Sequence, residues 1–240
     1  MKAILTFHSI DDSGSVLSFP IAKFEQLVNQ LSCSDITICP LDELLEPNID
    51  NALAITFDDG MISVFEHALP ILRNANVPSH LYLTTGAVGK DNRWPTQPAA
   101  APYFNMMSWD QIEACVEAGV NLEAHTHTHP WLTRLNDEAI IEECELADNT
   151  IEKKFGRKPR HFAYPYGDVN RHVCDVVGAR YKGCVTTELR PLPKSVNAAL
   201  LPRWDSYYLQ HSSDYKNLFS FSHMTYMNAR YLMRKVRAWL

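Results

Sequence analysis

Short apolar segments alternate with segments of helical spacing along the whole chain. Segments with the length of strands cover residues 3–7, 36–39, 53–57, 79–84, 120–124, 161–164 and 184–186. Helices are expected between them, over residues 21–31, 64–75, 108–119, 136–155 and 169–177, with Pro70 interrupting the second. Ser108 with Gln111 predicts a capping box, and Gly119 and Gly156 are expected to end helices. The alternation predicts parallel strands joined by crossover helices, in an open sheet or a closed barrel.

A length of 240 residues suits one large α/β domain or two small ones, and because no interior linker marks a boundary, a single domain over residues 1–240 is expected. The chain has 46% hydrophobic and 21% charged residues, as soluble globular proteins do, and its net charge of −6 argues against a general nucleic-acid-binding protein. Residues 91–107, rich in Pro, Ala and aromatic side chains, are expected to form a long loop after a strand. Because such loops build active sites in these folds, this one is a candidate wall of the site. The alternatives are core filling and a disordered excursion.

The first residues and the cysteines bear on where the protein works. Residues 1–8 carry too short an apolar stretch for a secretory signal and are expected to form a strand. No segment approaches the roughly 20 apolar residues of a membrane-spanning helix. The six cysteines are scattered, which favours buried thiols in a reducing compartment over a disulfide framework. A cytoplasmic location is therefore expected.

Two adjacent carboxylates, Asp58 and Asp59, follow one apolar strand. Burying such a pair is costly unless a cation lies beside it, because the like charges repel each other. The histidine-rich segment His125-Thr126-His127-Thr128-His129 follows another apolar run. Since these two strand ends can meet at one rim of the sheet, the carboxylates and imidazoles can form a hydrolytic metal site with positions left for water. The alternative is a solvated acid pair that caps the next helix.

Three motifs occur in order along the chain: Thr56-Phe57-Asp58-Asp59-Gly60, His125-Thr126-x-x-His129 and Tyr164-Pro165-Tyr166-Gly167. Together they resemble the polysaccharide deacetylase family of metal-dependent carbohydrate esterases, also called the NodB-homology domain. The resemblance extends from the first strand to about residue 205. It implies a distorted (β/α) barrel with fewer than eight strands, and an enzyme that hydrolyses the N-acetyl group of a sugar.

By this resemblance, Asp59, His125 and His129 bind a divalent metal ion. An Asp-His-His set with open positions favours Zn²⁺, while Co²⁺, Ni²⁺, Mn²⁺ or Fe²⁺ also fit it. His127 lies between the two histidine ligands and is the less favoured alternative ligand. Its expected place is beside the ligands or facing solvent.

The resemblance also implies two catalytic roles. Asp58 is the general base that takes a proton from the attacking water. The backbone N–H of Tyr166 helps to stabilise the oxyanion that develops on the substrate. The alternative for Pro165-Tyr166-Gly167 is a purely structural turn.

Two departures from the family pattern concern the groups around the base. Many members carry an arginine where Ala163 stands, and Arg203 is predicted to supply that charge from another strand; the alternative is a surface arginine. The family's late Leu-x-His motif, whose histidine protonates the leaving amine, has no good copy here, and His223 is expected in a helix or loop. Leu5-Thr6-Phe7-His8-Ser9 resembles the N-terminal segment of the exopolysaccharide deacetylase branch, where this element is circularly permuted. His8 is therefore predicted as the general acid, with a structural strand-end histidine as the alternative.

Residues 215–240 form a basic tail with five Lys or Arg and no acid. Helical spacing puts Arg230, Arg234 and Arg237 on one face, and Ala229, Leu232, Met233, Val236 and Leu240 on another. A terminal helix packed on its own domain is expected. The alternative is a helix that lies on an anionic membrane surface, at the inner face of the membrane.

These features predict an intracellular, metal-dependent deacetylase that acts on an N-acetylated sugar during assembly of a surface polysaccharide. Because no secretory signal is visible, a nucleotide-linked or lipid-linked sugar is favoured over finished polymer. One alternative is a non-sugar amide hydrolase of the same fold. Another is a carbohydrate-binding module with a decayed site, and the complete Asp-His-His set counts against both.

Overall fold

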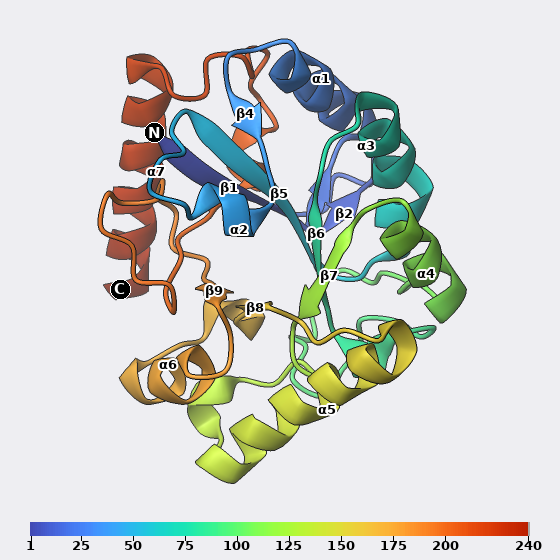
Figure 1. The fold of residues 1–240 in the computed structure, drawn as a ribbon. Helices are drawn as coiled ribbons and strands as arrows, with labels where there is room; N and C mark the ends of the chain where they lie inside the picture. Colours follow the sequence, from blue (N-terminus) through green and yellow to red (C-terminus); the bar gives the residue numbers. More distant parts are fainter. Residues whose placement is uncertain (240) are drawn as a thin grey trace.

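A curled parallel sheet forms the centre of the molecule, and helices surround it (Figure 1). The computed structural model describes residues 1–239, and the side chains of residues 1–237. Seven strands follow one another in the order β10-β1-β5-β6-β7-β8-β9, and their pairings are parallel. The short strand β4 lies off this path and pairs with the first residues of β5. This arrangement confirms the predicted fold, a distorted (β/α) barrel with fewer than eight strands.

The elements follow the expected order along the chain. The strands are β1 (Lys2–Phe7), β2 (Ser9–Ile10), β3 (Ser18–Phe19), β4 (Thr37–Ile38), β5 (Ala52–Asp59), β6 (His80–Leu83), β7 (Asn121–Ala124), β8 (His161–Ala163), β9 (Gly183–Val185) and β10 (Trp204–Asp205). The α-helices are α1 (Ile21–Ser32), α2 (Leu41–Leu44), α3 (Leu69–Ala75), α4 (Trp109–Glu117), α5 (Asp137–Phe155), α6 (Arg171–Gly178) and α7 (Phe221–Trp239). Shorter helical turns cover Val64–Ala68, Thr85–Ala87, Leu132–Arg134, Pro165–Gly167 and Ser206–Leu209.

The central strands are covered on both faces, which explains their continuous apolar runs. Every residue of β5 is buried. On one side of the sheet, Phe7, Phe19, Phe24 and Phe57 pack with ring centroids 5.2–5.8 Å apart. Phe24 lies on the buried face of α1. The apolar residues that recur at helical spacing in the sequence form this face.

Residues 201–205 close the sheet between its two edges. Leu201 forms a parallel bridge with Val185 of β9, while Trp204 pairs with Leu5 of β1. Arg203 lies between these two contacts and is almost completely buried. The closing segment therefore brings a cation, just ahead of the last strand, into the barrel.

The helix expected over residues 64–75 differs from the prediction in its first half. Val64–Ala68 form a π-helical turn, and α3 follows it. The wider turn precedes Pro70, which lacks an N–H for the α-helical ladder and whose ring would crowd the carbonyl four residues earlier, that of Glu66. The capping box of Ser108 and Gln111 at the start of α4 is present as predicted.

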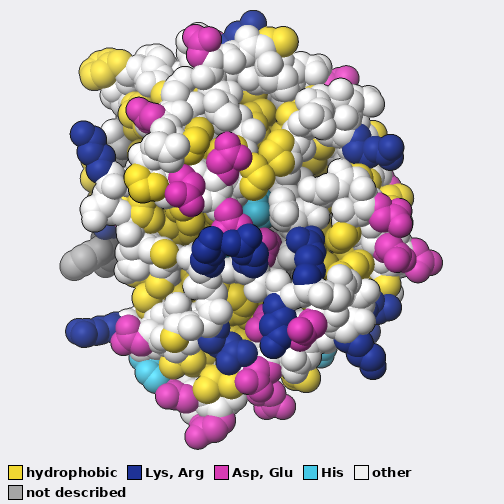
Figure 2. All heavy atoms as spheres, in the orientation of Figure 1, with side chains coloured by type: hydrophobic (Ala, Val, Ile, Leu, Met, Phe, Trp, Pro, Cys, Tyr) yellow, Lys and Arg dark blue, Asp and Glu magenta, His cyan; other side chains and the backbone are white. Residues whose placement is uncertain are grey.

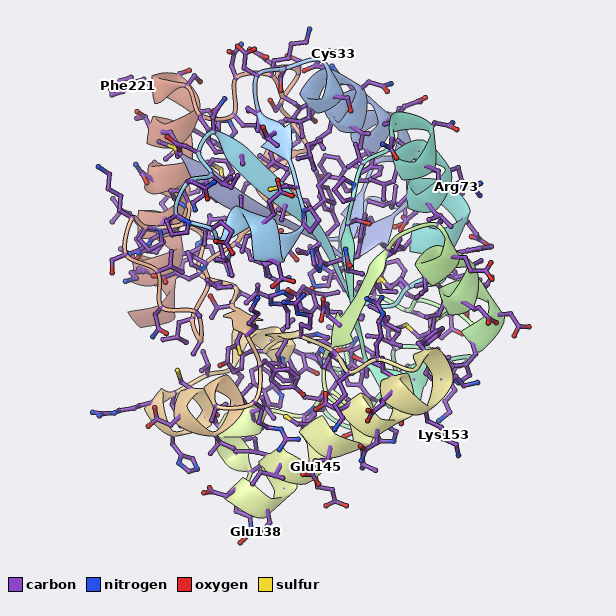
Figure 3. All side chains as sticks on the ribbon, in the orientation of Figure 1. Cys33, Arg73, Glu138, Glu145, Lys153 and Phe221 are labelled. Atoms are coloured by element: carbon purple, nitrogen blue, oxygen red, sulfur yellow. The ribbon has the colours of Figure 1, made fainter. Side chains whose placement is uncertain are left out.

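The C-terminal helix α7 starts at Phe221, later than the basic tail begins, and Tyr215 and Leu218 lie in the core ahead of it. Phe221 is 88% exposed and points away from the barrel (Figure 3). Met227 is the buried contact of the helix, while Leu232 and Val236 are about 60% exposed. The apolar face expected from the sequence thus faces solvent, and Leu240, which was predicted on that face, lies outside the described residues. Within residues 1–239, no helix is both long and apolar enough to cross a membrane.

Charged side chains of both signs are interspersed over the face of the molecule shown in Figure 2. Asp42 of α2 forms ion pairs with Arg160 at 2.8 Å and with Lys182 at 3.1 Å. All six cysteines are free thiols, and Cys33 is exposed at the end of α1 (Figure 3).

Candidate active site

The acid pair ends strand β5, and its two carboxylates face different partners. Asp58 makes a two-pronged ion pair with Arg203, with Oδ1–Nη1 and Oδ2–Nη2 distances of 2.7 and 2.6 Å. Both side chains are buried. Burial alone would raise the pKa of Asp58, but the charge and hydrogen bonds of Arg203 outweigh it and hold that pKa below its usual value. Asp58 is therefore an oriented carboxylate anion at neutral pH.

Arg203 is fixed by contacts on every side of its guanidinium. Its Nε donates to the Thr186 carbonyl at 3.0 Å, and Nη1 also donates to Thr56 Oγ1 at 3.2 Å. The ring of Tyr82 lies 5.7 Å from the guanidinium carbon. The surface-arginine alternative is wrong, because Arg203 is buried and paired with the predicted base.

We expect Arg203→Met to destabilise the protein by about 3–5 kcal/mol, because it leaves a buried carboxylate without its partner. The lowered pKa of Asp58 belongs to the folded state. The ion pair therefore stabilises the protein above the pKa of an unfolded aspartate, about 3.9, and this contribution is lost as pH falls through the folded pKa. Without Arg203 the pKa of Asp58 rises, so the acid limb of a kcat/KM–pH profile should move to higher pH. Denaturant unfolding and that profile check both effects.

Arg157→Met is the matched control, since Arg157 is exposed beyond α5. An Arg203→Met protein with the stability and acid limb of the wild type would contradict the proposed role of the ion pair.

Three side chains form a group that could hold a metal ion: Asp59, His125 and His129. Asp59 Oδ1 lies 3.2 Å from His125 Nε2 and 3.4 Å from His129 Nε2, and the two Nε2 atoms are 3.2 Å apart. All three side chains are buried. In the part of the chain that the structure describes, Asp59 Oδ1 has no geometrically acceptable hydrogen-bond donor. One carboxylate oxygen and two imidazole nitrogens thus converge on one point, which is the donor set that divalent zinc prefers.

The surroundings of the histidines suit metal binding. His125 Nδ1 lies 2.7 Å from the Ala163 carbonyl, so it carries the proton and Nε2 keeps its lone pair. Burial lowers the pKa of His129, which favours the neutral imidazole. Burial lowers the pKa of His125, but the nearby carboxylates of Asp59 and Asp58 outweigh burial and raise it, so a proton and a cation compete for this ring.

His127 does not join this group. Its Nδ1 lies 2.8 Å from Thr85 Oγ1, and its backbone N–H donates to Glu143. The structure therefore brings together the three residues predicted as ligands and keeps the alternative one apart. Their assignment as ligands remains a prediction for metal analysis.

The backbone of the motifs is left-handed at four residues that are not glycine: Asp59, Thr126, His129 and Tyr166, with φ between 58° and 71°. Such angles cost free energy unless the surroundings enforce them, and they concentrate at functional sites. Thr126 Oγ1 accepts the His129 N–H at 3.1 Å and so fixes the turn between the two histidines. Gly60 has φ of 101°, and an added Cβ would lie 2.6 Å from Leu83, which explains the glycine of the first motif.

His8 follows β1 and faces the same cavity as the acid pair. Its Nε2 lies 4.0 Å from Asp58 Oδ2, and the side chain is 26% exposed. His223, the alternative proton donor, belongs to α7 and packs against Trp204 with ring centroids 5.5 Å apart. The structure thus places His8 at the site and His223 on the C-terminal helix, against Trp204.

An aromatic wall that sequence reasoning did not resolve into residues completes the site. Trp94 packs on His129 with ring centroids 4.2 Å apart and donates its indole N–H to Tyr166 Oη at 2.9 Å. Thr96 donates to the His129 carbonyl at 2.6 Å, and Trp131 stacks on Tyr166 at 4.0 Å. Trp94 and Thr96 belong to the loop over residues 91–107, so that loop is a wall of the site as predicted. The position of the loop after a strand indicated this role. Nothing in the sequence indicated which of its side chains would contact the site.

These groups line a cavity of about 360 Å³ at the carboxyl ends of the strands. The cavity contains His8, Asp58, Asp59, His125, His129 and Tyr166, together with Trp94 and Thr187. The predicted site residues therefore share one cavity, except Arg203, which lies behind Asp58.

The fold and the site together define a (β/α)-barrel protein with a candidate hydrolytic metal centre. The chain belongs to the polysaccharide deacetylase family, whose model, described as "Polysaccharide deacetylase", matches residues 46–180. The resemblance seen in the three motifs is confirmed.

Curated relatives include the poly-beta-1,6-N-acetyl-D-glucosamine N-deacetylase of Staphylococcus aureus (strain MRSA252), which is 26% identical over 200 residues. That match covers 76% of this chain and 65% of the relative, so the chain spans about two thirds of the relative's length. The enzyme of the same name from Staphylococcus epidermidis is 25% identical over 125 residues, covering 48% of this chain and 40% of the relative.

Solved structures share the fold. IcaB from Ammonifex degensii superposes with a TM-score of 0.74 at 23% identity, covering 90% of this chain and 96% of that one. The deacetylase PplD of Streptococcus pyogenes, solved in complex with acetate, gives 0.72 at 20% identity, covering 85% and 91%.

Proposed function

We propose that this protein is a metal-dependent N-deacetylase that acts on an N-acetylated sugar in surface polysaccharide biosynthesis. One observation carries the proposal: a carboxylate held as an anion by Arg203 lies beside the Asp59-His125-His129 group in one cavity. The named substrate of the curated relatives, poly-beta-1,6-N-acetyl-D-glucosamine, supports an N-acetylated sugar as the substrate.

The residues present fit a divalent metal, since Asp59 Oδ1 and the two Nε2 atoms converge and the Oδ1 atom otherwise has no donor among the described residues. Such an ion supplies Lewis-acid polarisation of the amide carbonyl and lowers the pKa of water. Zinc suits this donor set best, with Co²⁺, Ni²⁺, Mn²⁺ and Fe²⁺ as alternatives.

The protein's own groups divide the proton transfers of amide hydrolysis. Asp58 Oδ2, held by Arg203, takes a proton from the attacking water. His8 Nε2 lies 4.0 Å from Asp58 Oδ2, and its side chain is partly exposed in the cavity, which suits a donor to the leaving amine. The left-handed backbone at Tyr166, with φ of 59°, supports a role of its N–H in stabilising the oxyanion.

Proton donation by His8 gives a direct prediction. We expect His8→Ala to lower turnover by roughly 10²- to 10⁴-fold, the usual size of an acid–base contribution. His223→Ala is the control, because His223 lies on α7 against Trp204 and does not line the cavity. Steady-state kinetics measure the turnover of both variants. A large loss in His223→Ala without one in His8→Ala would assign the proton donor to the C-terminal helix.

The proposed function is tested by acetate release. The metal-loaded protein is incubated with N-acetylglucosamine, its nucleotide-linked form and β-1,6-linked oligomers. Release from at least one of them, abolished by a chelator and restored by metal, is the expected result. Acetamide hydrolysis confined to non-sugar amides would instead favour the alternative amide hydrolase. Sugar binding without any hydrolysis would favour the decayed binding module.

We also propose that the protein works in the cytoplasm and contacts the inner membrane surface through α7. Six free thiols support a reducing compartment. Exposed Leu232, Met233 and Val236 with exposed Lys235 and Arg237 support contact with an anionic bilayer. We expect sedimentation with anionic vesicles that weakens at about 1 M salt, where the Debye length is about 3 Å. Recovery of the native protein outside the cytoplasm would refute the location, and no sedimentation at low salt would refute the contact.

A further inference from the structure

The two histidines of the Asp59-His125-His129 group are oriented in different ways. The ring of His125 is fixed by its Nδ1, which lies 2.7 Å from the Ala163 carbonyl oxygen. His129 Nδ1 is buried and has no hydrogen-bond partner in the described portion of the protein. Since metal-binding histidines ordinarily use this second nitrogen to set the direction of the ring, His129 must be oriented by its backbone and by the rings packed on it.

A chain of hydrogen bonds connects the loop over residues 91–107 to the backbone of His129. The indole N–H of Trp94 donates to Tyr166 Oη at 2.9 Å. Thr96 Oγ1 donates to the His129 carbonyl at 2.6 Å. An indole N–H can only donate and a carbonyl can only accept, so the direction of both hydroxyl groups is forced. The Tyr166 hydroxyl therefore donates to Thr96 Oγ1, 3.1 Å away, and the chain is continuous from Trp94 to His129.

The two backbone positions that this chain joins are both left-handed. His129 has φ of 58° and Tyr166 has φ of 59°, values that residues other than glycine keep only where their surroundings enforce them. The ring of His129 contacts the same partners, with centroid distances of 4.2 Å to Trp94 and 4.4 Å to Tyr166. The same loop contacts therefore hold both the ring and the backbone of His129.

The loop is anchored at its base, apart from the site. Asn92 is 1% exposed, and its side chain donates to the Pro102 carbonyl and accepts the Phe104 N–H, both at 2.9 Å. Trp94 belongs to a small buried apolar cluster with Met106 of the same loop. These contacts clasp the two ends of the loop together, so it can serve as a fixed support for the two left-handed residues.

We propose that Thr96 and the Tyr166 hydroxyl are positioning groups that fix the backbone of the predicted metal ligand His129 and couple it to the backbone N–H of Tyr166. Thr96 acts through His129 and not on the substrate. This inference rests on the proposed metal-dependent function and adds to it the groups that hold the metal ligand and the oxyanion donor in one geometry.

The test removes one hydroxyl at a time. Thr96→Val keeps the shape of the side chain, and Thr96→Ser restores a hydroxyl. Thr150→Val is the matched control, because Thr150 Oγ1 also donates to a backbone carbonyl at 2.6 Å, that of Leu146 in α5, outside the catalytic cavity. We expect Thr96→Val to weaken Zn²⁺ binding by roughly 10- to 100-fold, the usual effect of losing an outer partner of a metal ligand, and Thr96→Ser to recover most of the affinity. Competition with a chromophoric chelator measures the affinity.

Two further readouts separate positioning from a purely structural role. The visible absorption bands of the Co²⁺-loaded protein depend on ligand geometry, so they should shift in Thr96→Val and stay unchanged in Thr150→Val. In Thr96→Val we expect kcat to fall by roughly 10- to 100-fold while KM changes by less than about threefold, because the displaced groups act in the transition state.

A double-mutant cycle tests whether the two hydroxyls form one chain. Tyr166→Phe removes the second hydroxyl and keeps the ring. In Thr96→Val the Tyr166 hydroxyl has already lost its acceptor, so the double variant should lose less Zn²⁺ affinity than the product of the two single losses. Single losses that multiply would show independent contacts and overturn the coupling.

The outcomes separate this inference from the proposed function. Thr96→Val protein with the Zn²⁺ affinity and Co²⁺ spectrum of Thr150→Val overturns the inference, even where acetate release supports the deacetylase. If the wild type binds metal but releases no acetate from any sugar, the proposed function fails, and affinity and spectrum still decide the positioning role. If Thr96→Val does not fold, Tyr166→Phe alone should weaken Zn²⁺ binding by at least about threefold, the effect of losing one hydrogen bond, and an unchanged affinity overturns the inference.

Discussion

Replacement of Asp58 by asparagine is expected to lower acetate release by roughly 10²- to 10⁴-fold while the fold and the metal content stay unchanged. Asparagine keeps the shape of the side chain but cannot accept the proton of the attacking water. The predicted metal ligand is the neighbouring residue, Asp59, so the variant should keep its metal ion and the Lewis acid that the ion supplies. A loss in kcat and kcat/KM together would mark an interaction made in the transition state.

The control for this variant is stability. Asp58→Asn also weakens the contact with Arg203, so unfolding is measured beside activity. A protein that keeps most of its acetate release would rule out Asp58 as the base. Loss of metal together with activity would mean that Asp58 serves as a ligand instead.

Removal of the metal ligands should have the other large effect. We expect His125→Ala and His129→Ala each to weaken metal binding by more than the roughly 10- to 100-fold that loss of an outer partner costs. His127→Ala should change it little, because His127 is bonded to Thr85 and lies outside the group. Elemental analysis after gel filtration measures the bound metal in the three proteins.

A thermal shift gives an independent check of the same ligands. Metal that binds only the folded state stabilises it by about 4 kcal/mol at 1,000 times its Kd. Added Zn²⁺ should therefore raise the Tm of the wild type and of His127→Ala, and leave the other two variants nearly unchanged. Equal behaviour of all three would overturn the ligand assignment.

Much of this site could be predicted from the sequence because its residues follow strands. Asp58 and Asp59 end β5, and His125 follows β7, so the parallel topology alone brings them to one rim. The motif then distinguished His125 and His129 from His127, which spacing alone left open. Arg203 could be predicted only as a replacement for the arginine that many family members carry at the position of Ala163. Its contacts with Thr186 and Thr56 depend on how the barrel closes.

The parts that could not be predicted come from long-range packing without periodicity. Trp94 and Thr96 lie in a loop of mixed composition, and nothing local shows that they contact His129. The orientation of α7 was misjudged for a related reason. Its apolar stripe indicated a packed face, but the helix packs on the core through Met224, Met227 and Tyr231, which leaves the stripe exposed.

The closing segment has a consequence for how the protein is made. The strand that carries Asp58 leaves the ribosome early, whereas Arg203 is added 145 residues later. At about 5–20 residues per second, the carboxylate waits roughly 7–30 s for its cation. Until then an ionised Asp58 cannot be buried cheaply, so the nascent barrel should stay open on this side and expose its apolar interior. Chaperones that bind such surfaces would meet this chain during that interval, and ribosome-stalled chains ending before residue 201 should show it by their sensitivity to proteases.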